Sequence, residues 1–200
     1  MKLVFDTETT GLPKSWSAPA SDVNNWPRIV QLSWILIDDN YDGSNYIEMG
    51  DLIIKPDGWE IPVEVSNIHG ITQEIAHEKG IPIKEALQRF IEAVKKADTI
   101  IAHNISFDDK VTGCEVFRMS GNAEYWESLK ADKKIVCTMK SSINFCNLPR
   151  MKWPKLVELH QKLFGTDFEG AHNALFDVLA CAKCFTELVK RGIITLTTSV

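Results

Sequence analysis

Three short segments of this 200-residue chain carry acidic residues at positions that suit metal chemistry. The first holds Asp6 and Glu8, two residues apart at the end of a predicted strand, so both carboxylates point to one face. Two carboxylates so close do not both ionise cheaply without a cation. Oxygen ligands favour Mg²⁺ or Mn²⁺ over zinc, so the pair predicts a divalent metal site. A solvated strand end is the alternative interpretation.

The second segment, HNISFDD (103–109), follows a predicted strand and opens a predicted helix. Asp108 falls in the first helical turn, where the helix dipole favours an anion. It lies one residue from the apolar Phe107, whereas Asp109 lies on another face of the helix. A role as a capping or surface acid therefore fits Asp109 better than Asp108.

The third segment, HNALFD (172–177), places His172 and Asp177 about 140° apart if both are helical. They cannot share a helix face, so we expect His172 in the loop before the helix, from which it can reach the same site. Asp177 aligns with Cys181 and Cys184 on a face that is predicted to be buried. A carboxylate on an apolar face needs a partner, which a metal would supply.

Hydrophobic periodicity indicates the elements that must position these acids. A polar turn at 38–43 joins two predicted strands into an antiparallel hairpin. The predicted strands are 2–6, 29–37, 46–54, 99–102 and 135–137. The predicted helices are 82–94, 106–119, 154–164 and 174–190. Strands first, then strands alternating with helices, predict an α/β fold with a mixed sheet covered by helices.

Composition is that of one globular domain, with 44% hydrophobic and 24% charged residues. A net charge of −5 argues against a protein that grips nucleic acid by bulk positive charge. No stretch is long and apolar enough to span a membrane, and no secretory signal is evident. The five cysteines are odd in number and scattered, so we expect reduced thiols and a cytoplasmic protein.

Together, the three segments resemble the three motifs of the DnaQ-like DEDDh family of 3′→5′ exonucleases, which includes the proofreading domain of DNA polymerase III epsilon. The motifs stand here as DTETTG (6–11), HNISFD (103–108) and HNALFD (172–177), and IHGIT (68–72) resembles the family's His-Gly-Ile-Thr loop. The resemblance implies an RNase H-like fold, a mixed five-stranded sheet with helices on both faces. It also implies an exonuclease domain over residues 1–192, followed by a short tail at 193–200.

The activity implied by the resemblance is hydrolysis of single-stranded or frayed 3′ ends to nucleoside 5′-monophosphates, with DNA favoured over RNA. Two Mg²⁺ or Mn²⁺ ions would be held by Asp6, Glu8, Asp108 and Asp177. His172 would act as general base, since histidine exchanges protons readily near neutral pH. Substrate-binding residues would be Thr9, Leu12, His69, His103 and Phe107, and for each of them packing is the alternative role.

Three other functions stay open: an RNA-processing exoribonuclease, a proofreading subunit of a polymerase in DNA replication, and a catalytically silent nucleic-acid-binding module. Four converging acids argue against the silent module, which has no need of them. In this family the polymerase partner is usually held by a tail after the nuclease domain. Only residues 193–200 follow the last predicted helix, so a free-standing nuclease, for example in DNA repair, is expected.

Two surface features have alternative explanations. Residues 130–155 contain seven Lys or Arg and one Asp, a net charge of +6, and would track the substrate backbone or simply form a solvated surface. The loop at 13–27 follows the first motif and contains Trp16 and Trp26. It would contact the nucleic acid strand, or its tryptophans would only pin it to the sheet.

Overall fold

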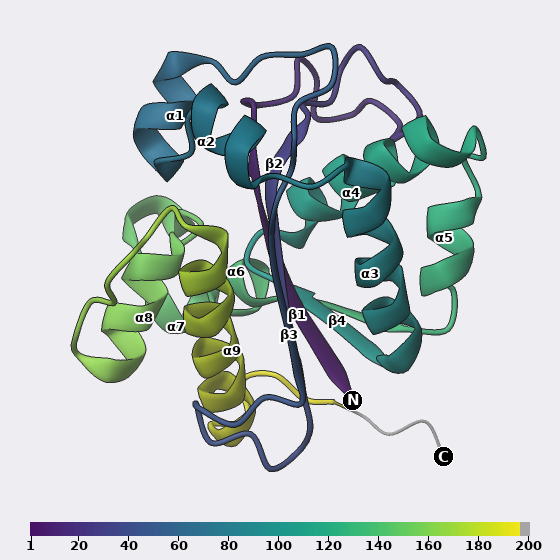
Figure 1. Cartoon of the computed structure of the whole chain (residues 1–200). Coiled ribbons are helices and arrows are strands. Elements are labelled where there is room, and N and C mark those ends of the chain that lie inside the picture. The colour runs from purple at the N-terminus through teal and green to yellow at the C-terminus, as the bar shows by residue number, and fades with distance from the viewer. Residues whose placement is uncertain (197–200) are drawn as a thin grey trace.

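A five-stranded mixed sheet forms the centre of the protein in the computed structural model, which describes residues 1–196. The strand order is β3-β2-β1-β4-β5. The strands are β1 (Lys2–Thr9), β2 (Ile29–Ile37), β3 (Glu48–Ile53), β4 (Thr99–Ala102) and β5 (Lys134–Cys137). Strands β1, β2 and β3 pair antiparallel, whereas β4 and β5 run parallel to β1. The predicted mixed sheet is therefore confirmed (Figure 1).

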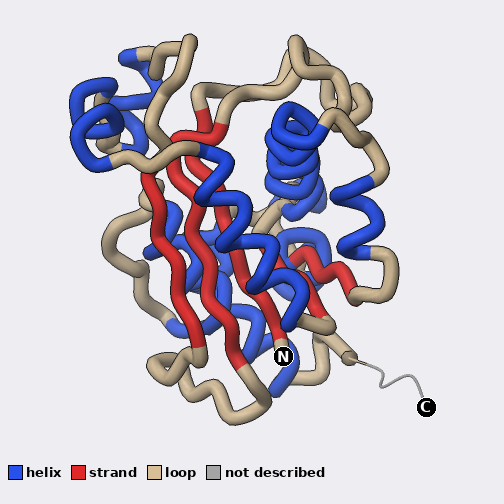
Figure 2. Tube along the Cα trace, turned by 45° about the vertical axis from the view of Figure 1, so that its right-hand side comes forward, coloured by secondary structure: helices blue, strands red, loops and turns tan. Residues whose placement is uncertain are grey.

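Helices cover both faces of the sheet, as Figure 2 also shows. One face carries α3 (Ile83–Lys96), α4 (Ile105–Ser120) and α5 (Tyr125–Lys130). The other carries α6 (Thr138–Ser141), α7 (Ile143–Cys146), α8 (Leu156–Phe164) and α9 (Ala174–Lys190), with the short 3₁₀ helix η1 (Pro149–Met151) before α8. Helices α1 (Val63–His69) and α2 (Gln73–Lys79) lie beside the end of the sheet toward which β1 runs (Figure 1).

Strand β1 supplies side chains to two separate hydrophobic cores, because successive residues of a strand point to opposite faces. Leu3 and Phe5 pack in the core under α3 and α4. Val4 packs in the core under α8 and α9. Asp6 and Glu8 continue the face of Val4, so the strand directs both carboxylates toward α9.

Several short helices were not predicted from the sequence: α1, α2, α5, α6 and α7 have only four to seven residues each. Segments this short hold too few turns to show a clear helical period. Cys181 and Cys184 are buried free thiols on α9, as expected for that face.

The chain continues to pack after α9. Ile193 and Ile194 donate backbone hydrogen bonds to the Leu188 carbonyl, and Ile194 is buried in the core under α9. Residues 193–196 of the predicted tail therefore lie against the domain, while 197–200 fall outside the described residues. Across residues 1–196, none of the helices combines the length and apolar character needed to cross a bilayer.

Candidate active site

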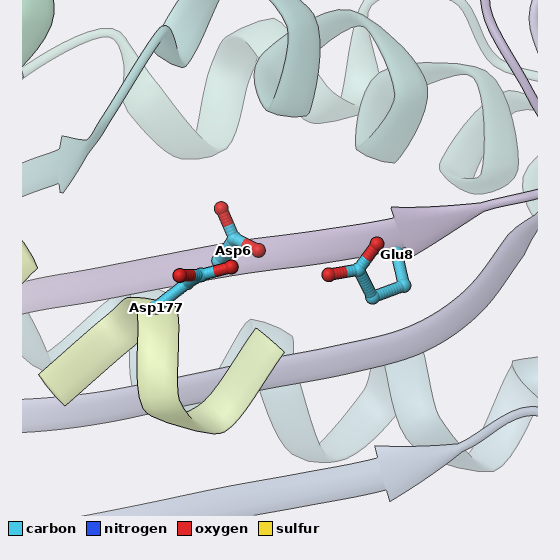
Figure 3. Close-up of side chains that lie close together, drawn as sticks. All are labelled: Asp6, Glu8 and Asp177. Atoms are coloured by element: carbon cyan, nitrogen blue, oxygen red, sulfur yellow. The ribbon is translucent and has the colours of Figure 1, made fainter. Parts of the chain in front are cut away.

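Three carboxylates from two distant parts of the sequence converge between β1 and α9. Asp6, Glu8 and Asp177 each offer one oxygen, and these oxygens all lie within 4.8 Å of one another (Figure 3). Asp6 and Glu8 come from adjacent same-face positions on β1, and Asp177 comes from the first turn of α9. An all-oxygen donor set of this kind fits Mg²⁺ or Mn²⁺.

The start of α9 is held in place by a buried glutamine that the sequence did not single out. Gln31 is 2% exposed and lies opposite Glu8 in the β1–β2 pairing. Its side-chain oxygen accepts from the Ala174 N–H at 3.2 Å, and its side-chain nitrogen donates to Asp51 at 2.7 Å. Gln31 therefore ties the segment between His172 and Asp177 to the strand beside the first motif.

Asp108 reaches the same strand from α4 on the opposite side of the sheet. It is 3% exposed, and its Oδ1 accepts from the Thr7 N–H at 3.1 Å and the Thr7 hydroxyl at 2.8 Å. Its negative charge helps to raise the pKa of Asp6, so the two carboxylates are electrostatic neighbours. The third motif and the second motif therefore meet the first from two sides of β1.

Burial makes the ionised forms of all four acids unfavourable. Desolvation, followed by the charges of Asp108, Asp177 and Glu8, raises the pKa of Asp6 well above its ordinary value. Desolvation is also the largest cause that raises the pKa of Glu8 to about 8, of Asp108 to about 7 and of Asp177 to about 6. Buried like charges without a compensating partner favour protonation, and a divalent cation reverses that preference. The donor set and its electrostatics thus both fit a divalent metal.

These pKa shifts predict that the metal-free protein loses stability as the pH rises. Because the folded-state pKa values of Glu8 and Asp108 exceed their unfolded values, the folded state binds more protons, and its stability falls as the pH rises through about 7 to 8. The lowered pKa values of His69 and His103 act in the opposite direction, but unfolded histidines are half deprotonated at about pH 6.5 and largely deprotonated above about pH 7.5, so they offset only a small part of this loss. In EDTA we expect the melting temperature to fall by about 5 °C from pH 6.5 to 8.5.

Calorimetry in EDTA and in Mn²⁺ measures this effect. The metal should raise the melting temperature more at pH 8.5 than at pH 6.5, because it replaces the protons of the acids. A melting temperature that is flat or rises with pH in EDTA would contradict the electrostatic description of the site.

His172 lies in the loop before α9, as its separation from Asp177 predicts. Its φ of 69° is left-handed, and its backbone N–H donates to the Asp177 carboxylate at 3.0 Å. The side chain is exposed, and its ring makes no hydrogen bond to another residue in the described range 1–196. The loop therefore presents a free imidazole next to the acid that ends the third motif.

Two further predicted site histidines, His69 and His103, are neutral, but they differ in whether a ring nitrogen is free of hydrogen bonds. His103 donates from Nε2 to the Pro154 carbonyl at 2.9 Å, and its Nδ1 lies 2.9 Å from the Thr138 hydroxyl, while burial lowers its pKa to about 4. The Nδ1 of His69 accepts from the Ile71 N–H at 3.1 Å, which places its proton on Nε2. That Nε2 is buried and has no hydrogen-bond partner among residues 1–196. His69 thus keeps a free donor, whereas His103 would have to break an internal bond to contact substrate.

The remaining predicted substrate-binding residues have different environments. Thr9 is buried, and its hydroxyl donates to the Gly11 carbonyl at 2.7 Å and accepts from the Gly11 N–H at 3.4 Å, so its side chain is engaged within the first motif. Leu12 is 74% exposed just after the first motif. Phe107 is half-buried and contacts Trp16. Exposed apolar side chains beside the acids are available to a ligand with apolar faces.

Asp109, the neighbour of Asp108, makes its hydrogen bonds with residues of α5 and not with the other acids. It accepts from the indole N–H of Trp126 at 2.8 Å and from the ammonium group of Lys130. Replacing Asp108 with Asn should lower the exonuclease rate that the motifs predict at least about 10²-fold, because it removes one charge from the predicted metal site. Replacing Asp109 with Asn should cost about 1–3 kcal/mol of unfolding free energy and leave turnover close to wild type. Steady-state rates and urea unfolding of both variants measure this contrast, and equal inactivity would contradict it.

The basic segment 130–155 does not form one surface. The Lys130 ammonium pairs with Asp109 and Glu127, and the Lys133 ammonium donates to the Ala97 carbonyl at 2.7 Å. Lys152 pairs with Glu158 at 2.8 Å. Neither interpretation of the segment, a surface that tracks the substrate backbone or a solvated surface, fits Lys130 and Lys133, whose side chains are nearly buried. Exposed positive charge remains at Lys140, Arg150, Lys152 and Lys155. The ammonium of Lys140 lies 5.8 Å from the centre of the Trp153 ring.

Solved structures of exonucleases share this fold. The chain superposes on exonuclease I with a TM-score of 0.73 at 22% identity, over 94% of this chain and 40% of that one. For E. coli exonuclease I in complex with a dT13 oligonucleotide, the TM-score is 0.72 at 25% identity, over 95% of this chain and 41% of that one. For exonuclease X in complex with 5′ overhanging duplex DNA, the TM-score is 0.63 at 21% identity, over 98% of this chain and 95% of that one. The chain spans about 40% of the length of exonuclease I and nearly all of exonuclease X.

The sequence itself gives the family. A comparison with curated proteins gave no match. The profile of the family described as Exonuclease (RNase_T) matches residues 3–185, a range that includes all three acidic motifs and both faces of the sheet. The five-stranded mixed sheet is the RNase H-like fold expected for that family. The chain belongs to the Exonuclease family.

Proposed function

We propose that this protein is a divalent-metal-dependent 3′→5′ exonuclease that releases nucleoside 5′-monophosphates from single-stranded or frayed 3′ ends. The observation that carries the proposal is the convergence of Asp6, Glu8 and Asp177 within 4.8 Å, with the buried Asp108 beside Asp6. Three partly buried acids and a buried one, brought this close together, destabilise the folded state unless a cation compensates their charges.

Each acidic residue has a proposed role toward the metal. Asp6, Glu8 and Asp177 would hold one cation, and Asp6 and Asp108 would hold a second from the other side of β1. Bound Mg²⁺ or Mn²⁺ ions would supply positive charge that activates a water and stabilises the leaving 3′ oxygen. The Thr7 N–H and hydroxyl both donate to the Asp108 carboxylate, which positions it and partly offsets the desolvation that raises its pKa.

His172 is the proposed general base. Its ring is free, and the bond from its own backbone N–H to Asp177 fixes the loop against the metal-binding acid. In this position the imidazole would take a proton from the attacking water and later release it to solvent. The left-handed backbone at this residue is a local strain that the contact with Asp177 offsets.

Single-stranded DNA is the proposed substrate. Related structures contain a dT13 oligonucleotide bound to E. coli exonuclease I and an overhanging duplex bound to exonuclease X. In this protein, the exposed Leu12 and the free Nε2 donor of His69 would contact the terminal nucleotide. The ammonium of the exposed Lys140 lies 5.8 Å from the centre of the Trp153 ring, and we propose that Lys140 and the exposed Arg150 contact phosphates further along the strand.

Labelled oligonucleotides test the proposed function. The protein is incubated with Mg²⁺ or Mn²⁺ and with 5′-labelled single-stranded DNA and RNA of the same sequence. We expect a ladder that shortens stepwise from the 3′ end, faster for DNA, and no reaction in EDTA. A faster ladder with RNA would replace the DNA assignment with the exoribonuclease alternative. Internal cutting or no shortening of either strand would contradict the proposal.

A further inference from the structure

Two tryptophans in the loop between β1 and β2 have opposite environments. Trp26 is 3% exposed, and its indole N–H donates to the Pro19 carbonyl at 3.0 Å. Trp16 is 56% exposed, and no described residue accepts a hydrogen bond from its indole N–H. Trp26 therefore anchors the loop, and Trp16 is presented to solvent by it.

The loop around Trp16 is rigidly built. The amide side chain of the buried Asn25 clamps Ser15, since its oxygen accepts from the Ser15 N–H at 2.7 Å and its nitrogen donates to the Ser15 carbonyl at 2.9 Å. Arg118 on α4 donates to the backbone carbonyls of Val23 at 2.7 Å and Trp26 at 2.8 Å. These hydrogen bonds hold the loop in one conformation, and that conformation keeps Trp16 exposed to solvent.

The ring of Trp16 contacts Phe107, which is the residue before Asp108. The Trp16 ring lies 5.8 Å from the ring of Phe107, with the two planes inclined by 52°. Phe107 directly precedes Asp108 on α4 and is half-buried against the core. The exposed Trp16 ring is therefore in tilted contact with the residue that directly precedes a proposed metal ligand.

We propose that Trp16 extends the substrate site as a stacking platform for a nucleobase of the single strand, outside the terminal nucleotide. This inference rests on the proposed function, because it takes the strand to end at the four acids. A large, rigid π face held by a fixed loop binds any base without sequence preference, which suits an enzyme that moves along a strand. A ring that is already held in place also loses little conformational entropy on binding.

The first test compares binding of a fluorescent single-stranded dT12 in a His172→Ala background, where hydrolysis is slow. Trp16→Ala should weaken binding by about 5- to 150-fold, the usual effect of losing one base–aromatic stack. Trp16→Phe should retain most of the affinity. The matched control is Tyr46→Ala, which removes another exposed aromatic ring, 42% exposed, from the loop after β2 at the Lys2 end of the sheet. Equal binding by Trp16→Ala and Tyr46→Ala would overturn the inference.

The second test shows whether the ring contacts a base. A set of 12-mers carries one abasic site at each of the four positions from the 3′ end. The loss caused by Trp16→Ala should disappear for the oligomer that lacks the stacked base and persist for the others. The same loss at all four positions, with an unchanged melting temperature, would overturn the inference, since Trp16 would then act without stacking.

The two proposals fail in different ways. If the wild-type protein shortens oligonucleotides and Trp16→Ala does so with unchanged KM, the platform is wrong and the exonuclease assignment stands. If the wild-type protein shortens none but binding depends on Trp16 at one abasic position, the platform stands and the proposed function is wrong.

Discussion

Replacing Asp6 with Asn should abolish tight Mn²⁺ binding and lower the rate of 3′-end hydrolysis at least about 10³-fold. Desolvation raises the pKa of Asp6, and the charges of Asp108, Asp177 and Glu8 raise it further, so all three acids are its electrostatic neighbours. The proposed cations would therefore share this carboxylate. Asparagine keeps the size of the side chain and removes its charge, so the expected loss reflects charge and not packing.

Calorimetric titration with Mn²⁺ and steady-state turnover measure the effect of Asp6→Asn together. Asp39→Asn is a suitable control, because Asp39 is an exposed acid paired with Lys2 at the other end of β1. That variant should bind Mn²⁺ and turn over like the wild type. Wild-type affinity for Mn²⁺ in Asp6→Asn would contradict the assignment of Asp6 to the metal.

Replacing His172 with Ala should lower kcat by about 10²- to 10⁴-fold, the usual contribution of a general base. Binding of Mn²⁺ and of a single-stranded oligonucleotide should be kept, because the proposed metal-binding acids are intact. The hydrogen bond to Asp177 comes from the backbone N–H of residue 172, so the substitution does not remove it.

A second variant separates the role of the His172 imidazole from that of its backbone conformation. Its φ of 69° is left-handed, and Asn adopts that conformation more readily than Ala does. His172→Asn should therefore be as slow as His172→Ala but more stable. Near-normal turnover in both variants would remove His172 from the mechanism, whereas recovery in Asn alone would mean that the loop conformation matters and the imidazole does not.

Much of the site could be predicted because its geometry is local. Asp6 and Glu8 share a face through strand alternation, and both continue the side of Val4. His172 lies outside α9 because five helical residues would turn it away from Asp177. The bounds of β2, β4 and α9 follow from long or clearly bounded apolar patterns, which tertiary contacts do not alter.

Other parts depend on contacts between residues far apart in the chain. Gln31 meets Ala174 across 143 positions, and Thr7 meets Asp108 across 101, and no spacing in the sequence indicates either pair. The environment of His103 depends on Pro154 in the same way. Net charge gave a misleading picture of segment 130–155, because Lys130 and Lys133 are used by partners that only the fold brings close.

A crystal structure with Mn²⁺, using its anomalous scattering, tests the central claim most directly. The account predicts an anomalous peak in contact with the carboxylates of Asp6, Glu8 and Asp177, and a second peak between Asp6 and Asp108. It also predicts that both peaks are lost in Asp6→Asn crystals grown under the same conditions. Anomalous peaks elsewhere, with none at these four acids at saturating Mn²⁺, would contradict it.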